Sequence, residues 1–142
     1  MKYLLDTCVL SELTKPQPAK AVMEWLDKQE ESSLFLSSLT IGEINKGIEK
    51  LDDSKRKVFL KNWLEHSVIA RFNERVITLD TRVAMYWGEL QANLIRAGKP
   101  MPVADSLIAA TALYQGFTLV TRNTRDMEPS GVLLFNPWDE HA

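Results

Sequence analysis

The feature that most constrains this chain is a short apolar run, Tyr3–Leu5, that stops at Asp6 and passes directly into a helical pattern. The run lacks the polar–apolar alternation of a half-exposed strand, which predicts a parallel strand buried on both faces. In the helical pattern that follows, Glu12 is predicted on the solvent side. Asp6 is therefore expected at the carboxyl end of a strand, where open α/β sheets bind ligands. Simple capping of the next helix is an open alternative for Asp6.

Further apolar runs alternate with amphipathic helical segments along the rest of the chain. Strands are predicted at Tyr3–Leu5, Leu34–Leu36, Val76–Leu79, Phe117–Thr121 and Val132–Leu134. Helices are predicted at about 7–13, 21–26, 39–51, 55–67, 81–97 and 103–115. The buried face of the 55–67 helix is predicted to comprise Phe59, Leu60, Trp63 and Leu64. Strands that alternate with helices favour an α/β fold with a doubly wound parallel sheet flanked by helices.

Length and composition exclude several classes of protein. At 142 residues the chain is expected to form a single domain, residues 1–142. The only cysteine, Cys8, excludes an internal disulfide and suits a reducing cytoplasm. No secretory signal is expected, and no apolar run is long enough to predict a membrane span. A net charge of −2 means that nucleic-acid binding would need a local basic patch or a metal ion.

Two acidic residues lie in helices where the local pattern is unusual. Glu43 falls at the edge of the apolar stripe of the 39–51 helix, and Gly47, one turn later, indicates that another group approaches closely. Asp105 lies in a helix that is apolar on nearly all sides, where a carboxylate must be paired, protonated or bound to a metal. A solvated Glu43 and a favourable helix-dipole position for Asp105 are the open alternatives.

A further acid, Asp126, follows the fourth predicted strand. In a doubly wound sheet this strand would lie beside the first, which brings Thr121, Asn123 and Asp126 to the same edge as Asp6. An ordinary turn stabilised by the Asn and Asp side chains is the alternative.

Clustered carboxylates without matching basic residues repel one another unless a cation lies between them. Mg²⁺ and Mn²⁺ prefer such oxygen ligands. An ion of this kind lowers the pKa of a bound water and neutralises charge on a phosphodiester. The acids therefore predict the chemistry of a metal-dependent nuclease.

Four segments together resemble the PIN-domain nucleases, most closely the VapC/FitB-type toxins of toxin–antitoxin pairs: LLDTCVLSEL, TIGEI, PVADSLIAATAL and VTRNTRDME. The resemblance covers essentially the whole chain. It implies a Mg²⁺- or Mn²⁺-dependent ribonuclease that hydrolyses tRNA, rRNA or mRNA, with strand order 3-2-1-4-5. It also implies a cytoplasmic homodimer and a cognate antitoxin that blocks the site. Operator DNA would be bound only through that antitoxin.

The resemblance also assigns roles to individual residues. The acidic cluster corresponds to Asp6, Glu43, Asp105 and Asp126, all expected to be catalytic. Asp6 and Asp105 are expected to bind the metal directly, and the other two acids to complete its coordination or to orient water. Residues expected to support the acids or to contact RNA are Thr7, Thr121, Asn123, Arg122 and Arg125. An ordinary solvated surface is the alternative for both arginines.

Three other residues qualify this assignment. Cys8 replaces the Asn that family members commonly carry, and a thiol is a poorer hydrogen-bonding partner than an amide. His66 and His141 lie outside the motifs and are expected to have no catalytic role.

Other functional classes are weighed against the nuclease. A haloacid-dehalogenase-type phosphatase would require a second Asp at the position of Cys8. A response-regulator receiver could use Asp80 for phosphorylation, but no Lys lies near the fifth strand. A scaffold that binds RNA or an antitoxin without catalysis is opposed by the presence of all four acids.

Overall fold

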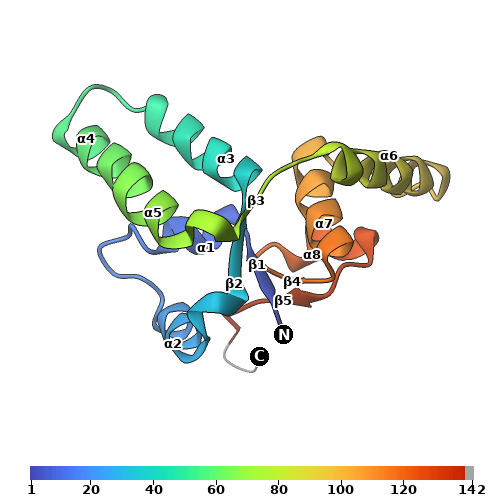
Figure 1. Cartoon of the computed structure of the whole chain (residues 1–142), viewed down its shortest axis with the longest axis horizontal. Coiled ribbons are helices and arrows are strands. Elements are labelled where there is room, and N and C mark those ends of the chain that lie inside the picture. The colour runs from blue at the N-terminus through green and yellow to red at the C-terminus, as the bar shows by residue number, and fades with distance from the viewer. Residues whose placement is uncertain (140–142) are drawn as a thin grey trace.

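The computed structural model describes residues 1–139, and its strands form one parallel sheet in the order β3-β2-β1-β4-β5 (Figure 1). The strands are β1 (Tyr3–Leu5), β2 (Leu34–Ser37), β3 (Val76–Ile77), β4 (Thr118–Val120) and β5 (Leu134–Phe135). The predicted α/β class and strand order are therefore confirmed. His141 lies outside the described residues.

Helices connect the strands and cover both faces of the sheet. The α-helices are α1 (Thr7–Glu12), α2 (Lys20–Lys28), α3 (Ser38–Glu49), α4 (Lys55–Asn62), α5 (Ile69–Phe72), α6 (Thr81–Arg96), α7 (Val103–Gln115) and α8 (Thr124–Met127). A π-helical segment, η2 (Trp63–Val68), joins α4 to α5. Short 3₁₀ turns are η1 (Glu31–Ser33), η3 (Asn73–Arg75) and η4 (Glu128–Ser130). No helix of the described residues is long and apolar enough to cross a membrane.

The central strand β1 separates two hydrophobic clusters. Leu5 packs with residues of α1, α2, α3, η2 and α5 on one face. Leu4 packs with residues of α6, α7 and α8 on the other face, and the two groups of helices lie on opposite sides of the sheet in Figure 1. Both leucines are almost completely buried, as the uninterrupted apolar run predicted. Because β2 and β4 flank β1, the segments after these strands meet at one edge of the sheet.

The fifth strand begins two residues later than the sequence predicted. Gly131 adopts a left-handed conformation with φ 77° after η4, and β5 then pairs through Leu134 and Phe135. Val132 is buried against the α6–α7 side of the sheet, whereas Leu133 is 68% exposed. The apolar run 132–134 therefore begins before the strand, because Val132 packs in the core without belonging to β5.

The predicted 55–67 helix extends further along the chain, and its middle part is a π-helix. The helical chain continues to Phe72, because η2 and α5 follow α4 without a break. Phe59, predicted to be buried, is 59% exposed, whereas Leu64 and Val68 face the core. Leu60, Leu64 and Val68 recur every four residues, so the buried stripe follows them and leaves Phe59 off its edge.

The sequence pattern also predicts the wrong solvent exposure for Glu12. It lies at the end of α1, where the helical period predicted a solvent-facing side chain, yet it is only 3% exposed. Hydrogen bonds from Lys15, from the backbone of Ala19 and from the indole of Trp138 satisfy its carboxylate. Since all three donors lie outside α1, the helix pattern alone could not reveal the burial.

Candidate active site

Asp6 lies at the carboxyl end of β1 with both carboxylate oxygens engaged. Its Oδ1 accepts a hydrogen bond of 2.8 Å from the backbone N–H of Thr7, at the start of α1. Its Oδ2 accepts one of 2.8 Å from the hydroxyl of Thr121. Asp6 is 7% exposed. The residue therefore caps α1, as the alternative proposed, and is also fixed from a second strand.

Thr121 connects the acid to the loop after β4. Its backbone N–H donates to the carbonyl of Phe135 in the neighbouring strand, which fixes its position in the sheet. Its hydroxyl donates to Asp6 and accepts a 3.1 Å hydrogen bond from the backbone N–H of Asn123. Thr121 is fully buried, so its hydrogen bond to Asp6 is shielded from bulk water.

Glu43 faces Asp6 from α3. Its Oε1 accepts a hydrogen bond of 3.1 Å from the hydroxyl of Thr7. Burial raises the pKa of Glu43, and the negative charges of Asp6 and Asp105 raise it further, while Lys46 opposes the shift. Glu43 is exposed as a residue, but its carboxylate lies near enough to Asp6 and Asp105 for their charges to act on it.

Gly47, on the same helix, does not mark a close approach. A Cβ atom built on it would meet nothing within 4 Å, so this prediction is wrong for the isolated chain. The missing side chain instead opens the wall of a groove, described below.

Asp105 lies in the first turn of α7 and is half-buried. Burial raises its pKa, and the charges of Asp6 and Asp126 add to that effect. Within residues 1–139, no hydrogen bond or ion pair satisfies its carboxylate. Asp105 is thus a partly desolvated acid whose neighbours are also acids.

These residues line one cavity of ≈ 380 Å³ at the carboxyl edge of the sheet. Its walls are formed by Asp6, Thr7, Cys8, Ser11, Glu43, Ala104, Asp105, Ile108 and Asn123. Three of the four predicted acids and two of the predicted supporting residues therefore converge. Asp126 lies outside the lining, exposed on α8, although its charge acts on Asp105. His66 belongs to η2 and does not line the cavity.

The donor set of the cavity suits a hard cation. In the described part of the chain, no three acidic, histidine or cysteine side chains stand close enough to form a complete set of ligands. The acids that share the cavity nevertheless offer only oxygen donors, which is the chemistry that Mg²⁺ and Mn²⁺ require. Burial raises the pKa of the Cys8 thiol, with Asp6 adding to the shift. A protonated thiol is a poor metal ligand, so the carboxylates are the better candidates.

Cys8 makes contacts with the loop after β4 in spite of its weak hydrogen-bonding capacity. Its Sγ accepts from the backbone N–H of Arg122 at 3.5 Å and lies 3.6 Å from the hydroxyl of Thr121. Arg122 and Arg125 are both exposed, and Arg122 directly precedes Asn123, which lines the cavity. The thiol therefore contacts the start of the loop that carries Arg122.

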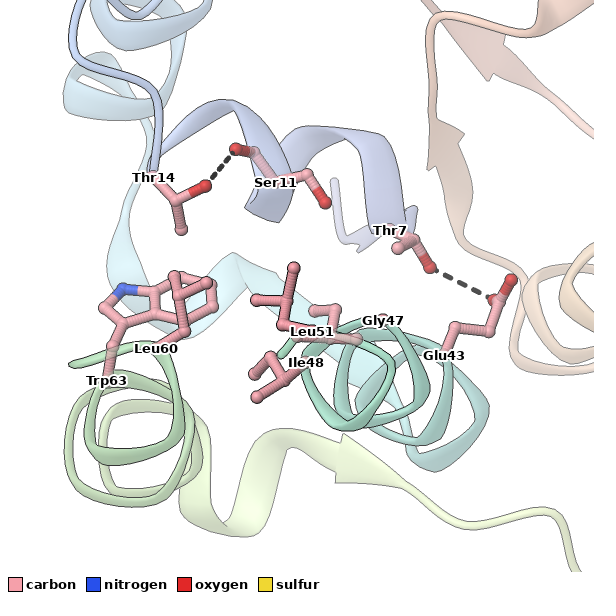
Figure 2. A pocket seen from close by; sticks show the side chains of 10 residues that line it. Thr7, Ser11, Thr14, Glu43, Gly47, Ile48, Leu51, Leu60 and Trp63 are labelled. Carbon is pink, nitrogen blue, oxygen red and sulfur yellow. Dashed lines mark hydrogen bonds between the residues drawn. The ribbon is translucent and has the colours of Figure 1, made fainter. Parts of the chain in front are cut away.

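A second cavity, of ≈ 280 Å³, adjoins the acids and is mostly apolar (Figure 2). It lies between α1, α3 and α4. Its lining comprises Thr7, Ser11, Thr14, Glu43, Ile44, Gly47, Ile48, Leu51, Leu60 and Trp63. We refer to it as the α1–α3 groove. Figure 2 shows the Thr7–Glu43 hydrogen bond at the end of the groove that meets the acids.

Ser11 is a site residue that the sequence did not indicate. It lines both the acidic cavity and the α1–α3 groove, one helical turn after Thr7. Ser11 shares a helix face with Thr7, because residues four apart lie on the same side of a helix. The sequence could therefore indicate Ser11 only after Thr7 had been assigned to the site.

Comparisons with known proteins agree on one family. The family model described as PIN domain matches residues 3–128. The chain is 37% identical to VapC ribonuclease Y4jK of Sinorhizobium fredii, covering 96% of this chain and 97% of that protein. It is 36% identical to Toxin FitB of Neisseria gonorrhoeae, covering 96% of this chain and 99% of that protein.

Solved structures lead to the same family. The structure of FitAB bound to an IR36 DNA fragment matches with a TM-score of 0.91 and 35% identity, covering 96% of each chain. DNA-bound VapBC from Salmonella typhimurium matches with a TM-score of 0.78 and 29% identity, covering 98% of this chain and 99% of that chain. The receiver alternative is also excluded by strand order, since receivers follow 2-1-3-4-5.

Proposed function

The chain belongs to the PIN-domain family, among the VapC- and FitB-type toxins, and from this premise we propose that it is a metal-dependent endoribonuclease that acts as the toxin of a toxin–antitoxin pair. The observation that carries the proposal is the convergence of Asp6, Glu43 and Asp105 on one cavity from three different elements. Relatives named ribonuclease or endonuclease support it. The proposed RNA substrate and the free Cys8 both suit a cytoplasmic location.

Asp6 and Asp105 would hold Mg²⁺ or Mn²⁺ directly, with Glu43 and Asp126 completing its coordination or orienting a bound water. The ion, when bound, supplies charge stabilisation at the phosphodiester and a water of lowered pKa. The chain's own residues set the geometry. Thr7 and Thr121 hold Asp6 through its two oxygens, and Thr7 also orients Glu43. Arg122 and Arg125 would bind RNA phosphates at the rim.

The test is RNA cleavage by purified protein freed of antitoxin. We expect cleavage with Mg²⁺ or Mn²⁺, none with a chelator, and a loss of at least 100-fold in Asp6→Asn and Asp105→Asn, as when metal ligands or their close supports are removed. Asp80→Asn is the matched control, because Asp80 caps α6 as Asp6 caps α1 but lies outside the acidic cavity. Undiminished cleavage by Asp6→Asn would refute the metal assignment.

Toxicity is a separate part of the proposal. Expression of the chain alone should arrest growth, and co-expression of a cognate antitoxin encoded by the adjacent gene should relieve the arrest. Continued growth with folded, cleavage-competent protein would remove the toxin role but leave the nuclease.

We propose that the antitoxin occupies the α1–α3 groove. Leu51, Leu60 and Trp63 supply apolar walls, and Glu43 supplies negative charge at one end, so an apolar segment followed by a basic residue would match (Figure 2). Similar structures such as FitAB and VapBC are complexes. Replacing Gly47 by Leu would fill the groove and should prevent co-purification of the antitoxin while cleavage is retained. Unchanged co-purification would refute this location.

The proposed homodimer requires an exposed apolar surface. A separate apolar cavity of ≈ 270 Å³ lies between α3 and α7, where Val103 is 58% exposed. We propose that a second copy covers it. Sedimentation should give a dimer for the wild type and a monomer for Val103→Glu.

A further inference from the structure

Arg122 is held at both ends, although its side chain is exposed. Its backbone N–H donates to the Sγ of Cys8 at 3.5 Å, which fixes the start of the loop after β4. Its guanidinium carbon lies 5.3 Å from the centre of the Trp138 ring. A guanidinium over an indole face is attracted by the ring electrons. Arg122 is therefore restrained at its backbone and at its guanidinium before any ligand binds.

Trp138 is itself anchored from the far end of the chain. Its indole N–H donates to Oε1 of Glu12 at 3.1 Å, and its backbone N–H donates to the side chain of Asn136 at 2.9 Å. Burial by itself raises the pKa of Glu12, but hydrogen bonds from Ala19, Lys15 and Trp138 outweigh this effect and hold the pKa below its ordinary value. The anchor is thus a buried carboxylate that stays ionised, at the end of α1.

We propose that Trp138 is a positioning residue for RNA binding: through its ring, fixed by Glu12, it holds the Arg122 guanidinium at the rim of the acidic cavity to receive an RNA phosphate. The proposal rests on the proposed function, because it names how that site would bind its substrate. Trp138 lies outside the four sequence motifs, and Glu12, although it belongs to the first of them, was predicted on the solvent side. Their joint effect on Arg122 is visible only in the folded chain.

Stacking and phosphate binding are compatible at Arg122. The attraction between the ring and the guanidinium is electrostatic, and the guanidinium carries five N–H donors in a planar fork that can bind a phosphate at the same time. Asn123, the next residue, lines the acidic cavity. A phosphate bound by Arg122 would therefore place the RNA backbone beside the carboxylates. Restraint of the free side chain reduces the conformational entropy that binding must otherwise remove.

The experiment measures RNA binding without cleavage. All variants are made in an Asp105→Asn chain, and binding of a fluorescent single-stranded RNA is followed by anisotropy over a range of salt concentrations. Arg122→Ala should raise Kd and reduce the slope of log K against log salt by about 0.7, which corresponds to one lost phosphate contact. Trp138→Leu should raise Kd roughly two- to fivefold. Trp138→Phe, which keeps a ring but loses the bond to Glu12, should fall between Trp138→Leu and the parent.

The double variant decides whether Trp138 acts through Arg122. Once Arg122 is Ala, Trp138→Leu should have no further effect on Kd. Trp25→Leu is the matched control: Trp25 is also half-buried, but its ring packs against Tyr3 and Phe135, whereas the guanidinium of Arg122 lies over Trp138, so loss of Trp25 should leave the Kd for RNA unchanged. Additive effects of Arg122→Ala and Trp138→Leu, or an effect of Trp25→Leu equal to that of Trp138→Leu, would overturn the proposal.

Cleavage assays separate this proposal from the proposed function. In the Asp105-containing chain, Trp138→Leu should raise KM with little change in kcat, because the acids are untouched. If the wild type cleaves RNA but Trp138→Leu has the same KM, only the positioning role fails. If the wild type neither cleaves nor binds RNA, the proposed function fails and the positioning role fails with it.

Discussion

Asp6 uses its two carboxylate oxygens to contact two different segments of the chain. One oxygen caps α1 through Thr7, and the other is bound by Thr121. Both hydrogen bonds fix the direction of the carboxylate before a ligand binds. The alternatives of cap and metal ligand therefore do not compete at this position.

For the single residue Thr121, we predict that Thr121→Val reduces RNA cleavage by roughly 10–100-fold, the usual cost of removing a hydrogen bond that orients a metal ligand. The shape of the side chain is kept, but the donor to Asp6 is lost. The measurement is kcat, with Thr121→Ser expected to restore most of it.

Thr111→Val provides the control for this prediction. Thr111 is equally buried, but its hydroxyl donates to the carbonyl of Leu107 within α7. The two valine variants should lose similar stability, and only Thr121→Val should lose activity. Equal activity in both would show that the Thr121–Asp6 bond has no catalytic effect.

Single residues could be predicted from the sequence where the local pattern was unusual. The sequence singles out Asp6 and Asp105, because each carboxylate adjoins an apolar segment. Trp138 and the burial of Glu12 could not be predicted, because their contact spans 126 positions of sequence. A local pattern carries no information about a partner that far away.

Among the elements, α3 forms one wall of both cavities and carries two glycines. Gly47 is helical, and a Cβ there would meet nothing within 4 Å. We predict that Gly47→Ala raises the free energy of unfolding by about 0.5–1 kcal/mol, because it removes backbone freedom from the unfolded chain. Chemical denaturation measures this change. A loss of stability would mean that the groove is more tightly packed than described.

A second prediction concerns the segment that leads into β2. Glu31 pairs with Arg71 and Arg75, and hydrogen bonding to Arg71, opposed by burial, lowers its pKa to about 2. A lowered pKa stabilises the fold above the ordinary value of 4.5 and loses that effect as pH falls towards 2. Glu31→Gln should therefore destabilise the protein by about 1 kcal/mol or less at pH 7, since the pair is half-exposed.

The pH dependence is the decisive measurement for Glu31. The difference in unfolding free energy between wild type and Glu31→Gln should shrink as pH falls from about 4.5 to about 2. Glu24→Gln is the control, because Glu24 forms only an exposed pair with Lys20 at 3.7 Å. A difference that persists at low pH would assign the effect to packing rather than to charge.

The elements themselves were largely predictable, because helix and strand periods are local. For example, α7 covers Val103–Gln115, the range that the sequence predicts. The late start of β5 and the π-helical segment η2 were not predictable, because each depends on packing against the rest of the fold. The exposure of Phe59 likewise depends on how its helix packs against the rest of the fold.

For the whole molecule, the acidic cavity predicts that a divalent ion stabilises the fold. At an ion concentration 100 times its Kd, binding adds about 2.7 kcal/mol to the free energy of unfolding. Thermal unfolding with Mg²⁺ or Mn²⁺ should therefore show a Tm raised by several degrees. Asp6→Asn should lose this shift and Asp80→Asn should keep it. An equal shift in both variants would place the ion elsewhere.

The pairing of β1 with β4 has a consequence for synthesis of the chain. Asp6 is made early, but its partner Thr121 follows 115 positions later. Until β4 leaves the ribosome, one edge of the central strand is unpaired and the first carboxylate is not oriented. A nascent or truncated chain that ends at residue 117 should therefore have no nuclease activity. The ribosome that synthesises the chain would then not be exposed to an active nuclease while the chain is still attached to it.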